Sequence, residues 1–230
     1  MPKLLRPSRR RFLQALAASV TVATLTCPAV EPPPAARLHA AATTAVANAK
    51  LTRYEHNTDI AADAGRYICD CSGLVVYLLR ATLPQHLKAV PKDAGKPRAL
   101  AWNFHALATA LPTSGEPGPD GWALVERLED TRAGDILVWR HNNPKPGSSG
   151  HVMIVDRAPE KEGRQYRVTI IDSGCSPHDR DTRPADTSGI GRGDVFLTVD
   201  QDGRPNAWRW SKPNGQINNE SILILRPVTN

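Results

Sequence analysis

A turn of small residues stands directly before an apolar run in the stretch Cys69-Asp70-Cys71-Ser72-Gly73-Leu74-Val75-Val76-Tyr77-Leu78-Leu79. This arrangement is the main signal of the fold in the sequence. We predict a helix over 72–82 with the Cys71 thiol at its N-terminus. At that position the unpaired backbone N–H groups and the positive end of the helix dipole favour the thiolate over the thiol. The pattern therefore predicts that Cys71 is a nucleophile.

A candidate base follows eighty residues after Cys71. His151 opens the apolar run Val152–Val155, which predicts a strand and so places the imidazole on a rigid element. A thiolate and an imidazole together are the minimum equipment for acyl transfer through a covalent intermediate. Taken singly, His151 could be a polar strand end and Cys71 a structural cysteine or half of a disulfide. Their pairing favours a catalytic site.

Three motifs in this order resemble those of the NlpC-type papain-like cell-wall cysteine peptidases. They are Asp70-Cys71-Ser72-Gly73-Leu74, Ala133-Gly134-Asp135-Ile136-Leu137-Val138-Trp139 and Gly150-His151-Val152-Met153-Ile154-Val155. The resemblance implies a papain-like half-barrel, in which a helix bearing the cysteine packs on an antiparallel sheet bearing the histidine. It also implies that the substrate is peptidoglycan, cut in its peptide stems, or another peptide. The expected reaction needs no metal and no organic cofactor.

The resemblance further assigns roles around the thiol. It implies that Asp70 and Ser72 meet the free amine of a stem peptide, and that the Cys71 backbone N–H contributes to the oxyanion hole. The family has a tyrosine upstream of the nucleophile, for which Tyr54 is the nearest match. Tyr67 is the alternative, and an ordinary core tyrosine is a third interpretation of either residue.

The order of the expected elements, helices first and strands after, is that of an α+β domain. A second helix is expected over 99–111, and the Gly- and Pro-rich segment 112–121 should be a loop. Strands are expected at 135–140, 151–156, 166–172, 195–199, 206–210 and 222–225.

A third group should accept a hydrogen bond from the other ring nitrogen of His151 and so fix its tautomer. Asp172, at the end of the next strand, is our first candidate, although the resembled family often has a histidine here. Asp172 would otherwise cap the turn that follows it. His178 is the competing orienter, in a Gly-rich segment, 176–194, that is either a substrate-binding loop or a solvated one.

Two other classes of function stay open. A zinc site could be built from Cys69, Cys71, Cys175 and His178, with His151 as a further ligand, although this would leave the Asp-Cys-Ser-Gly-Leu motif unexplained. A non-catalytic wall- or protein-binding module on the same fold is the other class. In an oxidising compartment we expect Cys69 and Cys175 to form a disulfide and Cys71 to stay free.

Asp135 also resembles a catalytic carboxylate at first sight. It stands in Ala133-Gly134-Asp135, directly before an expected strand, where turn chemistry explains it. We therefore leave Asp135 out of the site.

The N-terminus predicts export. Ser8-Arg9-Arg10-Arg11-Phe12-Leu13 matches the twin-arginine (Tat) signature, and the uncharged stretch 13–26 is too short and too weakly apolar for a membrane span. A basic amphipathic helix is the alternative, but the stretch has no polar face. We expect a periplasmic or secreted protein, exported by the Tat machinery, with no stable membrane span after signal removal.

The signal and the domains follow from this interpretation. Residues 1–40 would hold the signal and the start of a linker, 41–49 the rest of that linker, and 50–230 a single hydrolase domain. Cleavage is expected after Ala29 or Ala40. Lipidation of Cys27 is disfavoured, because a threonine precedes that cysteine.

The basic isoelectric point belongs to the targeting segment. The chain has 29 basic and 23 acidic residues, and 1–40 hold six of the former and one of the latter. The rest is therefore close to neutral, and no basic stripe is interleaved with aromatic residues. Nucleic-acid binding is not expected.

Overall fold

The computed structural model describes residues 31–113, 115–118, 120–145, 148–211 and 215–229. The compact unit of interest begins at Pro32. The twin-arginine signature and Cys27 lie outside the described residues, so the export signal stays a prediction. Among the helices that are described, none has the length and apolar character needed to cross a membrane.

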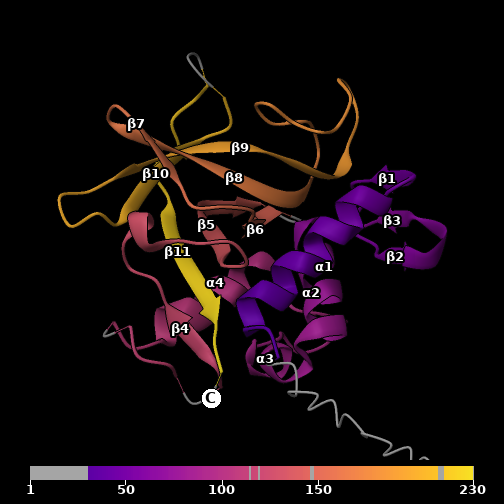
Figure 1. The fold of residues 1–230 in the computed structure, drawn as a ribbon, viewed down its shortest axis with the longest axis horizontal. Helices are drawn as coiled ribbons and strands as arrows, with labels where there is room; N and C mark the ends of the chain where they lie inside the picture. The colour runs from indigo at the N-terminus through magenta and orange to yellow at the C-terminus, as the bar shows by residue number, and fades with distance from the viewer. Residues whose placement is uncertain (1–30, 114, 119, 146–147, 212–214, 230) are drawn as a thin grey trace, which may run out of the picture. The chain divides into compact units, whose positions relative to one another are not determined.

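One antiparallel sheet of eight strands carries most of the fold, and it curls into a half-barrel (Figure 1). Its strands lie in the order β10-β9-β8-β6-β5-β11-β4, with β7 paired to β8. Their bounds are β4 (Trp122–Leu124), β5 (Ile136–Lys145), β6 (Ser148–Val155), β7 (Glu160–Glu162), β8 (Gln165–Gly174), β9 (Gly189–Val199), β10 (Pro205–Arg209) and β11 (Ser221–Pro227). Each of the six predicted strands is present, while the short strands β4 and β7 were not predicted. The expected α+β class with an antiparallel half-barrel is confirmed.

Apolar side chains cover both faces of this sheet. In β5, Ile136 and Val138 join the core beneath the helices, whereas Leu137 and Trp139 join a second core inside the curl. Successive side chains of a strand point to opposite faces, so a strand buried on both sides is apolar throughout. This double burial explains why the run opening at Ile136 shows no polar alternation.

Among the described residues, four helices accompany the sheet, and Figure 1 shows their arrangement. Helices α2 and α4 contact β5, β6 and β8 between them, and α1 and α3 contact α2. Their bounds are α1 (Pro34–Asn48), α2 (Cys71–Thr82), α3 (Pro84–Ala89) and α4 (Ala101–Ala110), with 3-10 turns η1 (Ala62–Ala64) and η2 (Leu128–Asp130). The two predicted helices thus exist as α2 and α4, each within two residues of the expected bounds.

A small sheet leads the chain into α2. Its strands β1 (Leu51–Arg53), β2 (Asp59–Ala61) and β3 (Arg66–Ile68) lie in the order β1-β3-β2, with β1 and β3 parallel. The chain passes from β3 through only two residues before α2 begins. This sheet therefore fixes where the N-terminus of α2 starts.

The predicted linker over 41–49 is wrong, because 34–48 form helix α1. Leu38, Ala42 and Ala45 recur at helical spacing and are buried in the core. The folded domain therefore begins before residue 50, and signal cleavage after Ala40 would cut a packed helix.

Candidate active site

Cys71 is the first residue of α2, and Asp70 is the N-cap. The Asp70 carboxylate accepts a hydrogen bond from the Gly73 N–H at 2.7 Å, which satisfies one of the free donors at this helix end. The Cys71 N–H has no intrahelical acceptor, because it belongs to the first turn. It is therefore available to a negatively charged oxygen next to the sulfur.

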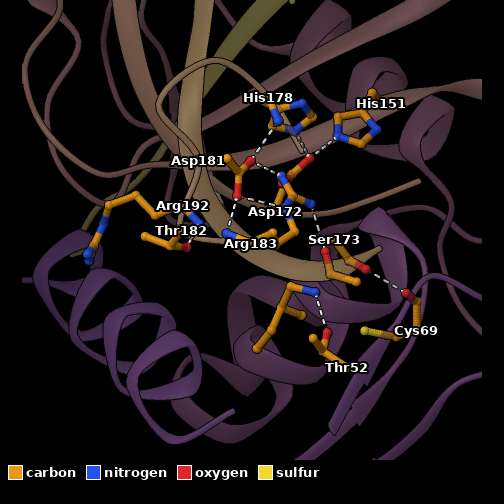
Figure 2. A network of polar contacts seen from close by, with 12 residues as sticks. Thr52, Cys69, His151, Asp172, Ser173, His178, Asp181, Thr182, Arg183 and Arg192 are labelled. Atoms are coloured by element: carbon orange, nitrogen blue, oxygen red, sulfur yellow. Dashed lines mark hydrogen bonds and ion pairs between the residues drawn. The ribbon is translucent and has the colours of Figure 1, made fainter. Parts of the chain in front are cut away.

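The β8 strand is tied directly to the turn that carries the thiol. The Ser173 hydroxyl donates to the carbonyl oxygen of Cys69 at 2.6 Å (Figure 2). Both groups are buried. Since Asp172 precedes Ser173, this bond holds the carboxylate at a set distance from the nucleophile.

His151 lies between Cys71 and Asp172. Its Nε2 is 2.7 Å from Asp172 Oδ2, and Cys71 lies close enough to the same imidazole to raise the His151 pKa. A carboxylate can only accept, so Nε2 carries a proton and Nδ1 is left for the thiol. Cys71, His151 and Asp172 therefore form one polar chain from the helix to the sheet.

Of the two candidate orienters, Asp172 contacts His151, and His178 contacts Asp172. His178 Nε2 lies 2.8 Å from Asp172 Oδ2, the oxygen that also accepts from His151, and Figure 2 shows both imidazoles turned toward it. Asp172 therefore contacts His151 directly, while His178 acts on His151 only through Asp172. The expectation that Asp172 merely caps a turn is wrong.

The charged forms of His151 and Asp172 stabilise each other. Burial alone would lower the pKa of His151, but the neighbouring Cys71 and the hydrogen bond to Asp172 outweigh it and raise the pKa to about 10. Burial alone would raise the pKa of Asp172, yet His178, the hydrogen bond to His151 and Arg183 hold it well below its usual range. The geometry thus favours an imidazolium beside an ionised carboxylate.

Sequence reasoning missed Arg183, which fixes Asp172 from below. Its side chain is 1% exposed, and Nη2 contacts Asp172 Oδ1 at 3.1 Å and Asp181 Oδ2 at 2.6 Å. Asp181 also accepts from the backbone N–H of His178 at 2.7 Å. The middle part of the segment 176–194 is therefore not a solvated loop, since the side chains of Asp181 and Arg183 fold back and hold the carboxylate. No local pattern in the sequence signals this pairing.

Tryptophans enclose the imidazoles, and sequence reasoning missed them too. Trp210 stacks on His178 with ring centroids 4.0 Å apart, and Trp139 stacks on His151 at 5.5 Å. Trp208 packs against both tryptophans, 4.2 Å from Trp139 and 5.0 Å from Trp210, and these two rings are 5.3 Å from each other. These rings limit rotation of both imidazoles and keep water away from one side of the His151, Asp172 and His178 side chains.

Tyr54 lies at the site, and Tyr67 does not. Tyr54 lines the same cavity as Cys71, and burial together with the neighbouring Cys71 raises the pKa of the Tyr54 phenol. Tyr67 is buried in the core, 6.4 Å from the ring of Tyr77. Tyr54 is thus the upstream tyrosine that the structure brings to the thiol.

The expected Cys69–Cys175 disulfide is absent. Cys69, Cys71 and Cys175 are all free, with Cys69 and Cys71 buried and Cys175 exposed. Desolvation raises the pKa of Cys69 to about 12. Cys69 is therefore a packing residue of the core, which the spacing in sequence did not reveal.

A cavity of about 290 Å³ opens beside Cys71. Asp70, Ser72 and Tyr54 line it together with the loop before α4 and the start of β6. Most of the expected site residues thus surround one space. His151, on β6, and His178, in the segment between β8 and β9, are not among the residues that line it.

The expected zinc ligands do not come together. Within the part of the chain that the structure describes, one group of three potential ligands is clustered, and it is His151, Asp172 and His178. The two histidines direct Nε2 at a carboxylate oxygen that accepts from both, which is hydrogen-bond geometry. The cysteine-based zinc hypothesis is not supported by this arrangement.

Asp135 lies away from the thiol and serves a turn. It accepts from the Arg132 backbone N–H at 2.9 Å and pairs with Arg226 at 2.7 Å. The turn interpretation of Asp135 is confirmed.

Comparisons with known proteins add no relative: no family model, no curated protein and no solved structure matches this chain.

Proposed function

We propose that this protein is a papain-like cysteine hydrolase that cleaves amide bonds with Cys71 as nucleophile. The observation that carries the proposal is the continuous chain from Cys71 through His151 to Asp172. A thiol at a helix N-terminus, a base on a neighbouring strand and a buried carboxylate that orients the base are the parts that such chemistry needs.

The reaction runs in two halves. The Cys71 thiolate attacks the carbonyl carbon, a C–S bond forms, and the oxygen takes up negative charge near the Cys71 N–H. His151 gives its Nδ1 proton to the leaving nitrogen, and the C–N bond breaks. Water then attacks the thioester, His151 takes a proton from it, and the carboxylic acid leaves as the thiolate is restored.

Asp172 keeps its charge throughout. It accepts from Nε2 of His151, so the ring presents Nδ1 to the sulfur and its positive charge is stabilised. His178 and Arg183 hold that carboxylate in place. His178 and Arg183 are therefore positioning residues.

The substrate follows from the resemblance to cell-wall peptidases. We propose peptide stems of peptidoglycan, met in the periplasm or outside the cell after export by the Tat route. A wall-binding module without activity is the competing function on this fold.

The test is to incubate the protein with purified peptidoglycan fragments and to follow new amine and acid termini by mass spectrometry. We expect cleavage by the wild type and none by Cys71→Ser or His151→Ala, with losses that are not additive, because the two residues act as one unit. Binding of the fragments without any cleavage by the wild type would favour the module instead.

A further inference from the structure

The cavity beside Cys71 is basic. Four charged side chains line it, three cationic and one anionic: Lys96, Arg98, Lys145 and Asp70. Lys96 belongs to the loop before α4, and Lys145 ends β5. The wall of the cavity thus carries an excess of positive charge directly next to the nucleophile.

Both carboxylate oxygens of the single acid, Asp70, already have hydrogen-bond partners within the protein. Its Oδ1 accepts from the Gly73 N–H at 2.7 Å and from the Ser72 hydroxyl at 3.0 Å. Its Oδ2 accepts from Arg98 Nη2 at 2.7 Å and lies 3.3 Å from His56 Nδ1. Four partners use the hydrogen-bonding capacity of a carboxylate, so an incoming amine would have to displace one of them.

Ser72 is occupied in the same way. Its hydroxyl donates to Asp70 and accepts from Arg98 Nη1 at 2.6 Å. Arg98 also donates to the His56 carbonyl at 3.2 Å, which anchors the guanidinium in place. An ammonium group approaching this corner would meet a fixed guanidinium, whose like charge repels it.

The two lysines are exposed and available. Among the described residues, neither ammonium group has an ion pair or a hydrogen bond. An unpaired cation at the wall of a cavity attracts anions before contact and holds a carboxylate once it is bound. With Asp70 neutralised by Arg98, Lys96 and Lys145 set the charge that a ligand meets.

We propose that this cavity binds an anionic, carboxylate-bearing segment of the substrate, and not the free amine that the family resemblance implies. The inference rests on the proposed function, because it takes Cys71 as the nucleophile. Lys96 and Lys145 are its specificity determinants, and Arg98 is the residue that removes Asp70 from amine recognition.

The test compares an anionic with a neutral reagent of similar size. Iodoacetate and iodoacetamide both alkylate Cys71, forming an S–C bond as iodide leaves. The ratio of their rate constants, divided by the same ratio for glutathione, measures the preference of the cavity for an anion. Dividing by the iodoacetamide rate removes any change in the intrinsic reactivity of the thiol. Peptide mapping assigns the label to Cys71.

For the full-length protein we expect a normalised ratio well above one at low ionic strength, because two unpaired lysines face the reagent. Lys96→Gln with Lys145→Gln should lower the ratio by about fivefold, the scale of two partly screened charges near the thiol. Salt should lower it in the wild type and much less in the double variant. Lys88→Gln, an exposed lysine of α3 outside the cavity, is the matched control and should keep the wild-type ratio.

The outcomes separate the two proposals. Rapid alkylation by iodoacetamide with a ratio near one, or a double variant that keeps the wild-type ratio, would overturn the anionic preference and leave the nucleophile standing. A Cys71 that iodoacetamide does not label would overturn the proposed function, and this inference with it.

Discussion

Asp172→Asn is the substitution that most sharply tests the proton chain, because the asparagine keeps the shape and removes the charge. Asp172 Oδ2 lies 2.7 Å from His151 Nε2, which puts the two charge centres about 4 Å apart. At an effective dielectric constant of about 20, that separation corresponds to about 4 kcal/mol of stabilisation of the imidazolium. Since 1.4 kcal/mol is about tenfold, the rate of the acyl-transfer step should fall by about a thousandfold.

The assay needs no substrate. We expect the alkylation of Cys71 by iodoacetamide to slow markedly at about pH 6, because the loss of Asp172 lowers the pKa of His151 and with it the share of the thiolate–imidazolium pair. The deficit should shrink as the pH rises and the thiol ionises without help. Peptide mapping assigns the label to Cys71.

Asp194→Asn is the matched control. Asp194 is also a buried carboxylate on the sheet and accepts from Thr169 at 2.6 Å, but it does not touch His151. We expect this variant to keep the wild-type alkylation profile. If Asp172→Asn keeps that profile as well, Asp172 does not stabilise the imidazolium, and the reasoning is refuted.

Three further predictions concern stability and export. Leu38→Ala should lower the free energy of unfolding by about 2–5 kcal/mol in urea titrations, because Leu38 is fully buried in α1. Thr44→Ala, at an exposed position of the same helix, should change it little. Equal effects would mean that α1 is not part of the core. The folded-state pKa of Asp172 is depressed, so its carboxylate stabilises the fold above about pH 4, and that contribution is lost as the pH falls. The gap in Tm between wild type and Asp172→Asn should therefore shrink when the pH is lowered from about 6 to about 3. A constant gap contradicts this prediction. Arg9→Lys with Arg10→Lys should leave the precursor in the cytoplasm of a Tat-competent host, as immunoblots of cell fractions would show, and normal delivery would refute the Tat route.

Local chemistry explains what the sequence revealed. The helix at Cys71 is predictable because its N-cap, Asp70, and its apolar run lie within a dozen residues of one another. The strands around Ile136 and His151 are predictable because unbroken β-branched and aliphatic runs favour strands buried on both faces. These same local signals placed the thiol and the base.

The rest depended on contacts between distant segments. Arg183 is an ordinary surface residue by composition, and only the return of the chain after β8 buries it against Asp172. The sequence predicts a linker where helix α1 forms, because alanine and proline are typical of linkers, although alanine is also the strongest helix former. The imagined Cys69–Cys175 bridge failed because Cys69 faces the core, a direction that spacing does not reveal.

Activation of Cys71 can be measured inside the protein itself, because a second thiol, Cys175, serves as the reference. Cys175 is exposed and Cys71 is buried, and desolvation raises the pKa of Cys175. Limiting iodoacetamide at about pH 6, followed by peptide mapping, measures which thiol reacts first. We expect Cys71 to be labelled first and His151→Ala to abolish this preference. Labelling of Cys175 ahead of Cys71 in the wild type would mean that exposure alone governs reactivity and that Cys71 is not activated.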